Sequence, residues 1–189
     1  MRRGFLLLDL GDVVWDECPA QRHMMQTALG ALPEFNEDDW NAAYQSAVSN
    51  HVLNRFMGTL RILTNNQERI EEVIRLVNQD FFNMPLMQYV GLHPLREDFY
   101  SSMNAIRKDC DVAIIANQHV KAQELVSYYN IDKYVDFIAL SGFFGKKKPS
   151  LDFFSSVLRK FTNDYVFKLM VGNRIDLDLM PAHFLGLRT

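Results

Sequence analysis

Side chains that could carry out chemistry stand at the ends of four short apolar runs. In chain order they are Asp9 in GFLLLDL, Asn117 in DVAIIAN, Lys148 after VDFIAL, and Asn173, Asp176 and Asp178 after VFKLMVG. An ionised carboxylate such as Asp9 can serve as a nucleophile. The remaining residues offer a cation and oxygen ligands, so they form a candidate site if the four runs lie side by side.

The elements that must position these residues follow from the pattern of apolar side chains. Each of the four runs is short and continuously apolar, which is typical of a buried parallel strand. Helical patterns lie between the later runs, at residues 119–130 and 150–164. This alternation predicts an α/β fold with a parallel sheet, and ligands of such sheets bind at the carboxyl ends of the strands.

The alternation is interrupted between residues 17 and 90, where the sequence predicts only helices. They cover residues 21–32, 37–53 and 67–82. We therefore expect a core formed by residues 1–16 and 91–189, with a helical cap formed by residues 17–90. A helix starting at Pro94 leads back into the core, because proline is favoured in the first turn of a helix.

The last segment leaves one feature of the sheet open. A fifth strand would be expected after the helix DLMPAHFLG, and the sequence stops at Gly186–Thr189. A short edge of the sheet and a truncated sequence both agree with this pattern.

Composition excludes several classes of function. The 189 residues are 48% hydrophobic and carry a net charge of −3, so the chain can form a core but has no basic field for nucleic acid or an anionic membrane. No apolar stretch is long enough to span a membrane. Cys18 and Cys110 lack the spacing of a zinc site or a disulfide framework. We expect a cytoplasmic protein with no nucleic-acid or membrane partner, and the oligomeric state is left open.

The sequence resembles the haloacid dehalogenase (HAD) superfamily over nearly its whole length. Residues 114–154, IIANQHVKAQELVSYYNIDKYVDFIALSGFFGKKKPSLDFF, are similar to the second and third motifs of that family, and residues 169–189 are similar to the fourth. The resemblance implies a Rossmann-like core with an inserted all-helical cap. It also implies a phosphatase-type hydrolase that forms an aspartyl-phosphate on Asp9.

The same resemblance implies the roles of several other residues. Lys148 would pair with the nucleophile and with the phosphoryl oxygens, and Asn117 would contribute to substrate binding. Magnesium would be held by Asp9, by the backbone carbonyl of Gly11 and by Asp178, with Asn173 beside them.

Three positions depart from the motifs of the family's phosphatases. Gly11 replaces the second aspartate, which protonates the leaving group, and the loss of such a group costs about 10²–10⁴ in rate. Restoring it by Gly11→Asp is therefore expected to raise turnover, unless Asp12 already serves as the acid. Ala116 replaces a hydroxyl residue that binds a phosphoryl oxygen, and Asn173 replaces an anionic ligand. Magnesium is accordingly expected to bind weakly or not at all.

Three functions remain open at this point. The first is a weakened phosphatase acting on a small phosphorylated compound or a phosphoprotein. The second is an inactive protein of the same fold that binds a phosphorylated or acidic ligand, or a protein partner. A minor third is a haloacid dehalogenase, whose fourth motif Asn173 and Asp176 reproduce. In any retained site, Asp9 and Lys148 should lie within hydrogen-bonding distance of each other.

Overall fold

The computed structural model describes residues 4–162 and 164–189. Residues 1–3 of the predicted core segment, and residue 163 near the end of a predicted helix, lie outside the described residues. The chain divides into two compact units. The core unit consists of Met1–Glu17 and His93–Thr189, and the helical unit consists of Cys18–Leu92.

A four-stranded parallel sheet organises the core unit, with the strand order β3-β2-β1-β4. The strands are β1 (Gly4–Leu8), β2 (Cys110–Ala116), β3 (Phe137–Leu140) and β4 (Phe167–Val171). Strand β1 is central, and Gly4 lies opposite Cys110 on one side and Phe167 on the other. The predicted α/β class with a parallel sheet is confirmed.

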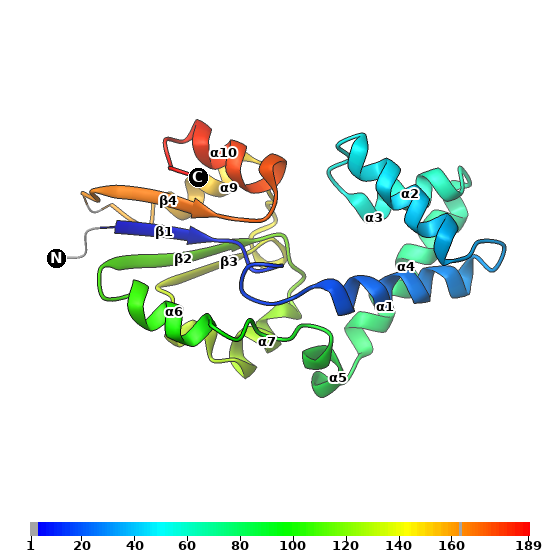
Figure 1. Cartoon of the computed structure of the whole chain (residues 1–189), viewed down its shortest axis with the longest axis horizontal. Helices are drawn as coiled ribbons and strands as arrows, with labels where there is room; N and C mark the ends of the chain where they lie inside the picture. The colour runs from blue at the N-terminus through cyan, green and yellow to red at the C-terminus, as the bar shows by residue number, and fades with distance from the viewer. Residues whose placement is uncertain (1–3, 163) are drawn as a thin grey trace. The chain divides into compact units, whose positions relative to one another are not determined.

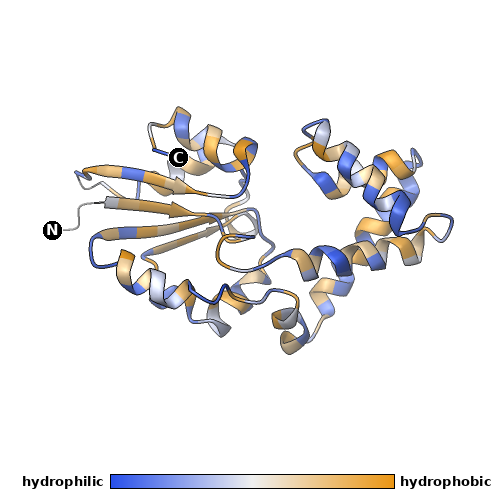
Figure 2. Cartoon of the chain, viewed as in Figure 1, coloured by the Kyte–Doolittle hydropathy of each residue, from blue (hydrophilic) through white to orange (hydrophobic). Residues whose placement is uncertain are grey.

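Helices cover both faces of this sheet, which explains why the strands are continuously apolar. Figure 1 shows α6 (Phe99–Ile106) and α7 (Ala122–Tyr128) on one face, and α9 (Leu151–Leu158) and α10 (Met180–Phe184) on the other. All five residues of β1 are buried, and the strands are predominantly hydrophobic in Figure 2. The buried cluster between the sheet and α9 includes Phe5, Leu7, Ala113, Ile115, Phe153, Phe154 and Val157.

The loop after β1 accounts for one difference from the predicted helices. Helix α6 begins at Phe99 rather than at Pro94. The segment before it is extended, because the backbone N–H of Asp16 donates to the carbonyl of Pro94, and the N–H of Arg96 donates to that of Val14. This pairing ties the loop after β1 to the chain that returns from the helical unit.

Five helices form the helical unit, and the sequence predicted three of them. They are α1 (Cys18–Ala31), α2 (Glu37–Ser49), α3 (Arg55–Leu63), α4 (Gln67–Asn83) and α5 (Leu86–Gly91). Asparagine side chains at positions 36, 54 and 66 accept backbone N–H groups at the start of α2, α3 and α4. None of the helices in the described ranges combines the length and apolar character needed to cross a bilayer.

The last residues add a short pairing at the edge of the sheet. Arg188 pairs in parallel with Leu169 of β4, through N–H groups of Met170 and Arg188 that donate across the two segments. The segment that was expected to continue toward a fifth strand therefore lies along β4.

Replacing a core aromatic residue of α9 tests this packing. Phe153 is fully buried against the sheet, whereas Leu151 of the same helix is 45% exposed. Phe153→Ala is expected to lower the free energy of unfolding by about 3–5 kcal/mol, because it leaves a cavity in the core. Leu151→Ala should change it by less than about 1 kcal/mol. Urea denaturation measures both, and equal losses would contradict the described packing.

Candidate active site

A buried lysine joins two carboxylates at the carboxyl ends of the strands. Nζ of Lys148 lies 2.7 Å from Oδ1 of Asp9 and 2.5 Å from Oδ1 of Asp178. The relative exposures of Asp9, Lys148 and Asp178 are 8%, 3% and 0%. The predicted proximity of Asp9 and Lys148 is thus confirmed, while the catalytic roles assigned to them stay predictions.

Asp9 directly follows β1, the central strand, and its two carboxylate oxygens differ. Oδ1 faces Lys148 and also accepts the backbone N–H of Leu10 at 2.8 Å. Within residues 4–162 and 164–189, Oδ2 accepts no hydrogen bond. Burial raises the pKa of the Asp9 carboxyl, and the Lys148 ammonium opposes this effect by favouring the ionised form. One oxygen is therefore fixed, and the other is available to a substrate or a cation.

Asp178 reaches the lysine from the turn after β4. Its Oδ2 accepts the backbone N–H of Arg174 at 3.0 Å, which fixes the carboxylate against its own turn. A Cβ atom at Gly172 would collide with this carboxylate. A residue without a side chain is therefore required at position 172 for Asp178 to approach.

Asn117 holds the main chain of Lys148 in place. Its Oδ1 accepts the N–H of Lys148 at 2.7 Å, and its Nδ2 donates to the carbonyl of the same residue at 3.0 Å. Ala116, the preceding residue, is fully buried at the end of β2. The structure thus gives Asn117 a contact that the sequence did not predict, and the substrate-binding roles of both residues stay predictions.

Asp12 is held by contacts within the loop after β1. Its Oδ1 accepts the backbone N–H of Glu17 at 3.0 Å, and its Oδ2 accepts Nδ2 of Asn173 at 3.1 Å. The residue has a φ of 57°, in the left-handed region that aspartate tolerates better than most residues. Both oxygens of Asp12, the substitute acid that the sequence left open, are therefore engaged in holding the loop.

Glu17 is a member of the site that the sequence did not identify. A Cβ atom at Gly11 would lie within 2.7 Å of both carboxylate oxygens of Glu17, so this carboxylate occupies the space left by the missing side chain. Burial raises the pKa of Glu17 to about 7, and the negative charges of Asp9 and Asp12 add to the effect. No motif marks position 17, and the only available signal was a carboxylate in the same loop as the missing aspartate.

Residues at the ends of β1 and β4 carry oxygen atoms of the kind that a small hard cation binds. Magnesium prefers carboxylate and carbonyl oxygens, and Oδ2 of Asp9, Asp178 and the side-chain carbonyl of Asn173 are ligands of that kind. The donor set therefore agrees with the predicted cofactor.

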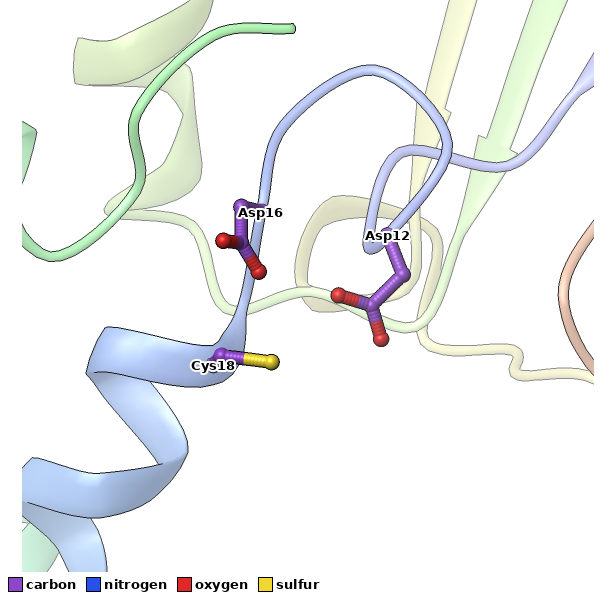
Figure 3. A group of neighbouring side chains, drawn as sticks. All are labelled: Asp12, Asp16 and Cys18. Atoms are coloured by element: carbon purple, nitrogen blue, oxygen red, sulfur yellow. The ribbon is translucent and has the colours of Figure 1, made fainter.

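A second acidic pair lies further along the loop. Figure 3 shows Asp12 and Asp16, whose nearest carboxylate oxygens lie within 4.8 Å of each other, on the segment that leads to Cys18 at the start of α1. Asp12 already binds Asn173 and the N–H of Glu17. Exposed acidic groups often lie close together without a bound ion, so we assign no metal site to this pair.

Solved structures with the same architecture identify the fold. A suggested phosphatase from Clostridium difficile superposes with a TM-score of 0.75 at 16% identity, covering 99% of this chain and 83% of that chain. YfnB from Bacillus subtilis, a suggested HAD-hydrolase whose structure is bound to magnesium, gives 0.66 at 16% identity, with coverages of 99% and 85%. The chain has the haloacid dehalogenase fold. No family model matches the sequence, and no curated protein matches it.

The haloacid dehalogenase fold does not by itself decide the reaction. A 2-haloacid dehalogenase from Pseudomonas syringae also superposes, with a TM-score of 0.57 at 16% identity and coverages of 100% and 85%. Proteins named for two different reactions therefore share this architecture with the chain. The reaction must be argued from the side chains of the site.

Removal of the shared ammonium should be strongly destabilising. Lys148→Met leaves the carboxylates of Asp9 and Asp178 buried without their cation, and the expected loss of unfolding free energy is about 3–5 kcal/mol. The neighbouring Lys147 is exposed, so Lys147→Met should change stability by less than about 0.5 kcal/mol. Urea denaturation of the two variants compares them, and similar stabilities would contradict the described ion pairs.

Glu17 should make stability fall as pH rises. Its pKa is about 7 in the folded protein, against an ordinary value of 4.5. Between these values the folded state holds a proton that the unfolded chain has released, so raising the pH favours unfolding. Glu17→Gln removes this contribution. The stability of the variant relative to wild type should rise between pH 4.5 and pH 7, by at most about 3 kcal/mol. A difference that stays constant over this range would contradict the raised pKa.

Proposed function

We propose that the chain is a phosphate-ester hydrolase in which Asp9 is the nucleophile. The observation that carries the proposal is the buried ammonium of Lys148, shared by Asp9 and Asp178 at the carboxyl ends of the strands. Burying three charged groups is costly, and a purely structural core could be built from apolar side chains instead. Such an arrangement is typical of a site that handles a charged substrate.

The two oxygens of Asp9 suit this reaction. Oδ1 is fixed by Lys148 and by the N–H of Leu10, which leaves Oδ2 to attack phosphorus. The Lys148 ammonium lies within reach of the same centre and can stabilise the charge of the phosphoryl oxygens in the transition state. The aspartyl-phosphate is then hydrolysed, so one difficult displacement is divided into two easier ones.

Magnesium is the proposed cofactor. Asp9, Asp178, the Asn173 carbonyl and the Gly11 backbone carbonyl are the proposed ligands. When bound, the ion supplies Lewis-acid stabilisation of the phosphoryl oxygens. The magnesium bound to YfnB supports this proposal at the level of the shared fold.

Binding without turnover is the second candidate function. Ala116 is fully buried and carries no hydroxyl group, so it offers no side-chain donor at the position that the family resemblance assigned to phosphoryl binding. A protein that binds a phosphorylated or acidic ligand through Lys148 would not need that donor. In either function, the proposed ligand is a small phosphorylated compound or a phosphorylated protein side chain.

Hydrolysis of p-nitrophenyl phosphate separates the two functions. The wild-type protein should release nitrophenolate at a rate that increases with added magnesium. Asp9→Asn should abolish this activity, because an amide oxygen is a poor nucleophile, and it keeps the volume of the side chain. Circular dichroism and urea denaturation check that the variant is folded. Equal background rates for the two proteins would exclude hydrolysis and favour ligand binding.

A further inference from the structure

The carboxylate of Glu17 lies directly beside Gly11, two residues beyond the proposed nucleophile. A Cβ atom at Gly11 would lie within 2.7 Å of both of its oxygens. The space that a side chain at position 11 would fill therefore contains a carboxylate from another part of the loop.

The contacts of Glu17 orient its carboxylate without neutralising it. Nε2 of Gln118 donates to Oε1 at 2.5 Å, and Nε1 of the fully buried Trp15 lies 3.5 Å from the same oxygen. These partners are uncharged, in contrast to the ammonium that binds Asp9 and Asp178. Gln118 follows Asn117, which holds the main chain of Lys148, so one segment after β2 positions both the cation and Glu17.

Asp12 is a weaker candidate for the same task. Its carboxylate accepts the N–H of Glu17 and the amide of Asn173, so both oxygens are used to hold the loop. The first of these hydrogen bonds fixes the main chain of Glu17 itself. Asp12 therefore acts on the position of Glu17, and the contacts from Gln118 and Trp15 both go to Oε1 of Glu17 rather than to Oε2.

From this geometry we infer that Glu17 replaces the missing aspartate as the proton carrier of the reaction. The inference rests on the proposed function, since it assigns a further catalytic residue to that same hydrolysis. Gly11 then has a steric role, because the absence of a side chain there makes room for the carboxylate of Glu17.

Glu17 donates a proton in the first step of the reaction and accepts one in the second. In the first step, Oδ2 of Asp9 forms a bond to phosphorus while the bond to the leaving oxygen breaks, and the Glu17 carboxylic acid gives its proton to that oxygen. In the second step, water attacks phosphorus and passes a proton to the Glu17 carboxylate. The bond between phosphorus and Asp9 breaks, which returns the Asp9 carboxylate, inorganic phosphate and a protonated Glu17.

Pre-steady-state kinetics of Glu17→Gln test this assignment. Nitrophenolate leaves without protonation, so the variant should still form the aspartyl-phosphate from p-nitrophenyl phosphate. Hydrolysis of this aspartyl-phosphate should be slow, because no carboxylate accepts the proton of the attacking water. We expect a burst of nitrophenolate, a phosphoryl adduct in the intact mass, and a steady-state rate lowered by about 10²–10⁴. Glycerol phosphate, whose leaving group needs a proton, should give neither burst nor adduct. Glu124→Gln, on the exposed side of α7, is the matched control and should behave as wild type.

Moving the carboxylate provides a second test that does not depend on one variant. Glu17→Ala should lower the turnover rate and leave space beside Gly11. The double variant with Gly11→Asp should turn over at least tenfold faster than Glu17→Ala alone. In the wild-type background, Gly11→Asp should give no rise, because Glu17 already occupies the position. Failure of the double variant to recover activity, although it is folded, would overturn the inference.

The outcomes also separate this inference from the proposed function. If Glu17→Gln turns over at the wild-type rate while Asp9→Asn is inactive, Glu17 is not the proton carrier, and the proposed hydrolase function still holds. Equal background rates for wild type and Asp9→Asn would overturn both assignments. A burst followed by slow turnover supports both, since a merely structural defect would not trap the phosphorylated enzyme.

Discussion

The Lys148 ammonium, buried between two carboxylates, is the interaction on which the rest of the site depends. It joins Asp9 at the end of the central strand to Asp178 in the turn after β4. Asn117 at the end of β2 fixes the main chain of the lysine. Desolvating one ion is expensive, so each of these three charged groups is stable only while its partners stay in place. The ends of the strands are thereby held in one arrangement.

Two glycines make this arrangement sterically feasible, and they do so in the same way. A side chain at Gly172 would collide with the carboxylate of Asp178, and a side chain at Gly11 would collide with that of Glu17. In both cases a carboxylate from six residues further along the chain fills the space. The absence of a side chain at position 11 is therefore compensated locally, because the carboxyl group of Glu17 fills that space.

The continuously apolar runs predicted the sheet, because the inner strands β1 and β2 are buried at all but one of their positions between helices on both faces. They also placed Asp9 and Lys148 at the same edge of the sheet, and the resemblance to the haloacid dehalogenase superfamily predicted that they pair. The boundaries of α6 were not predictable, because Pro94 and Arg96 pair with the loop after β1, which is a contact distant in sequence. Glu17 was missed for a similar reason. Its place depends on the left-handed turn at Asp12 and on contacts with Gln118, and neither has a signature in the sequence.

The same loop shows why a motif comparison and a structure can assign different acids. By position in the chain, Asp12 is the nearest substitute for an aspartate at residue 11. A single step along a tight turn, however, points the next side chain in another direction, and Asp12 bonds to Asn173 and to the N–H of Glu17. Glu17 has a longer side chain and enters from the far end of the turn, so it can return to Gly11. The geometry of the turn thus makes the nearer carboxylate a support for the more distant one.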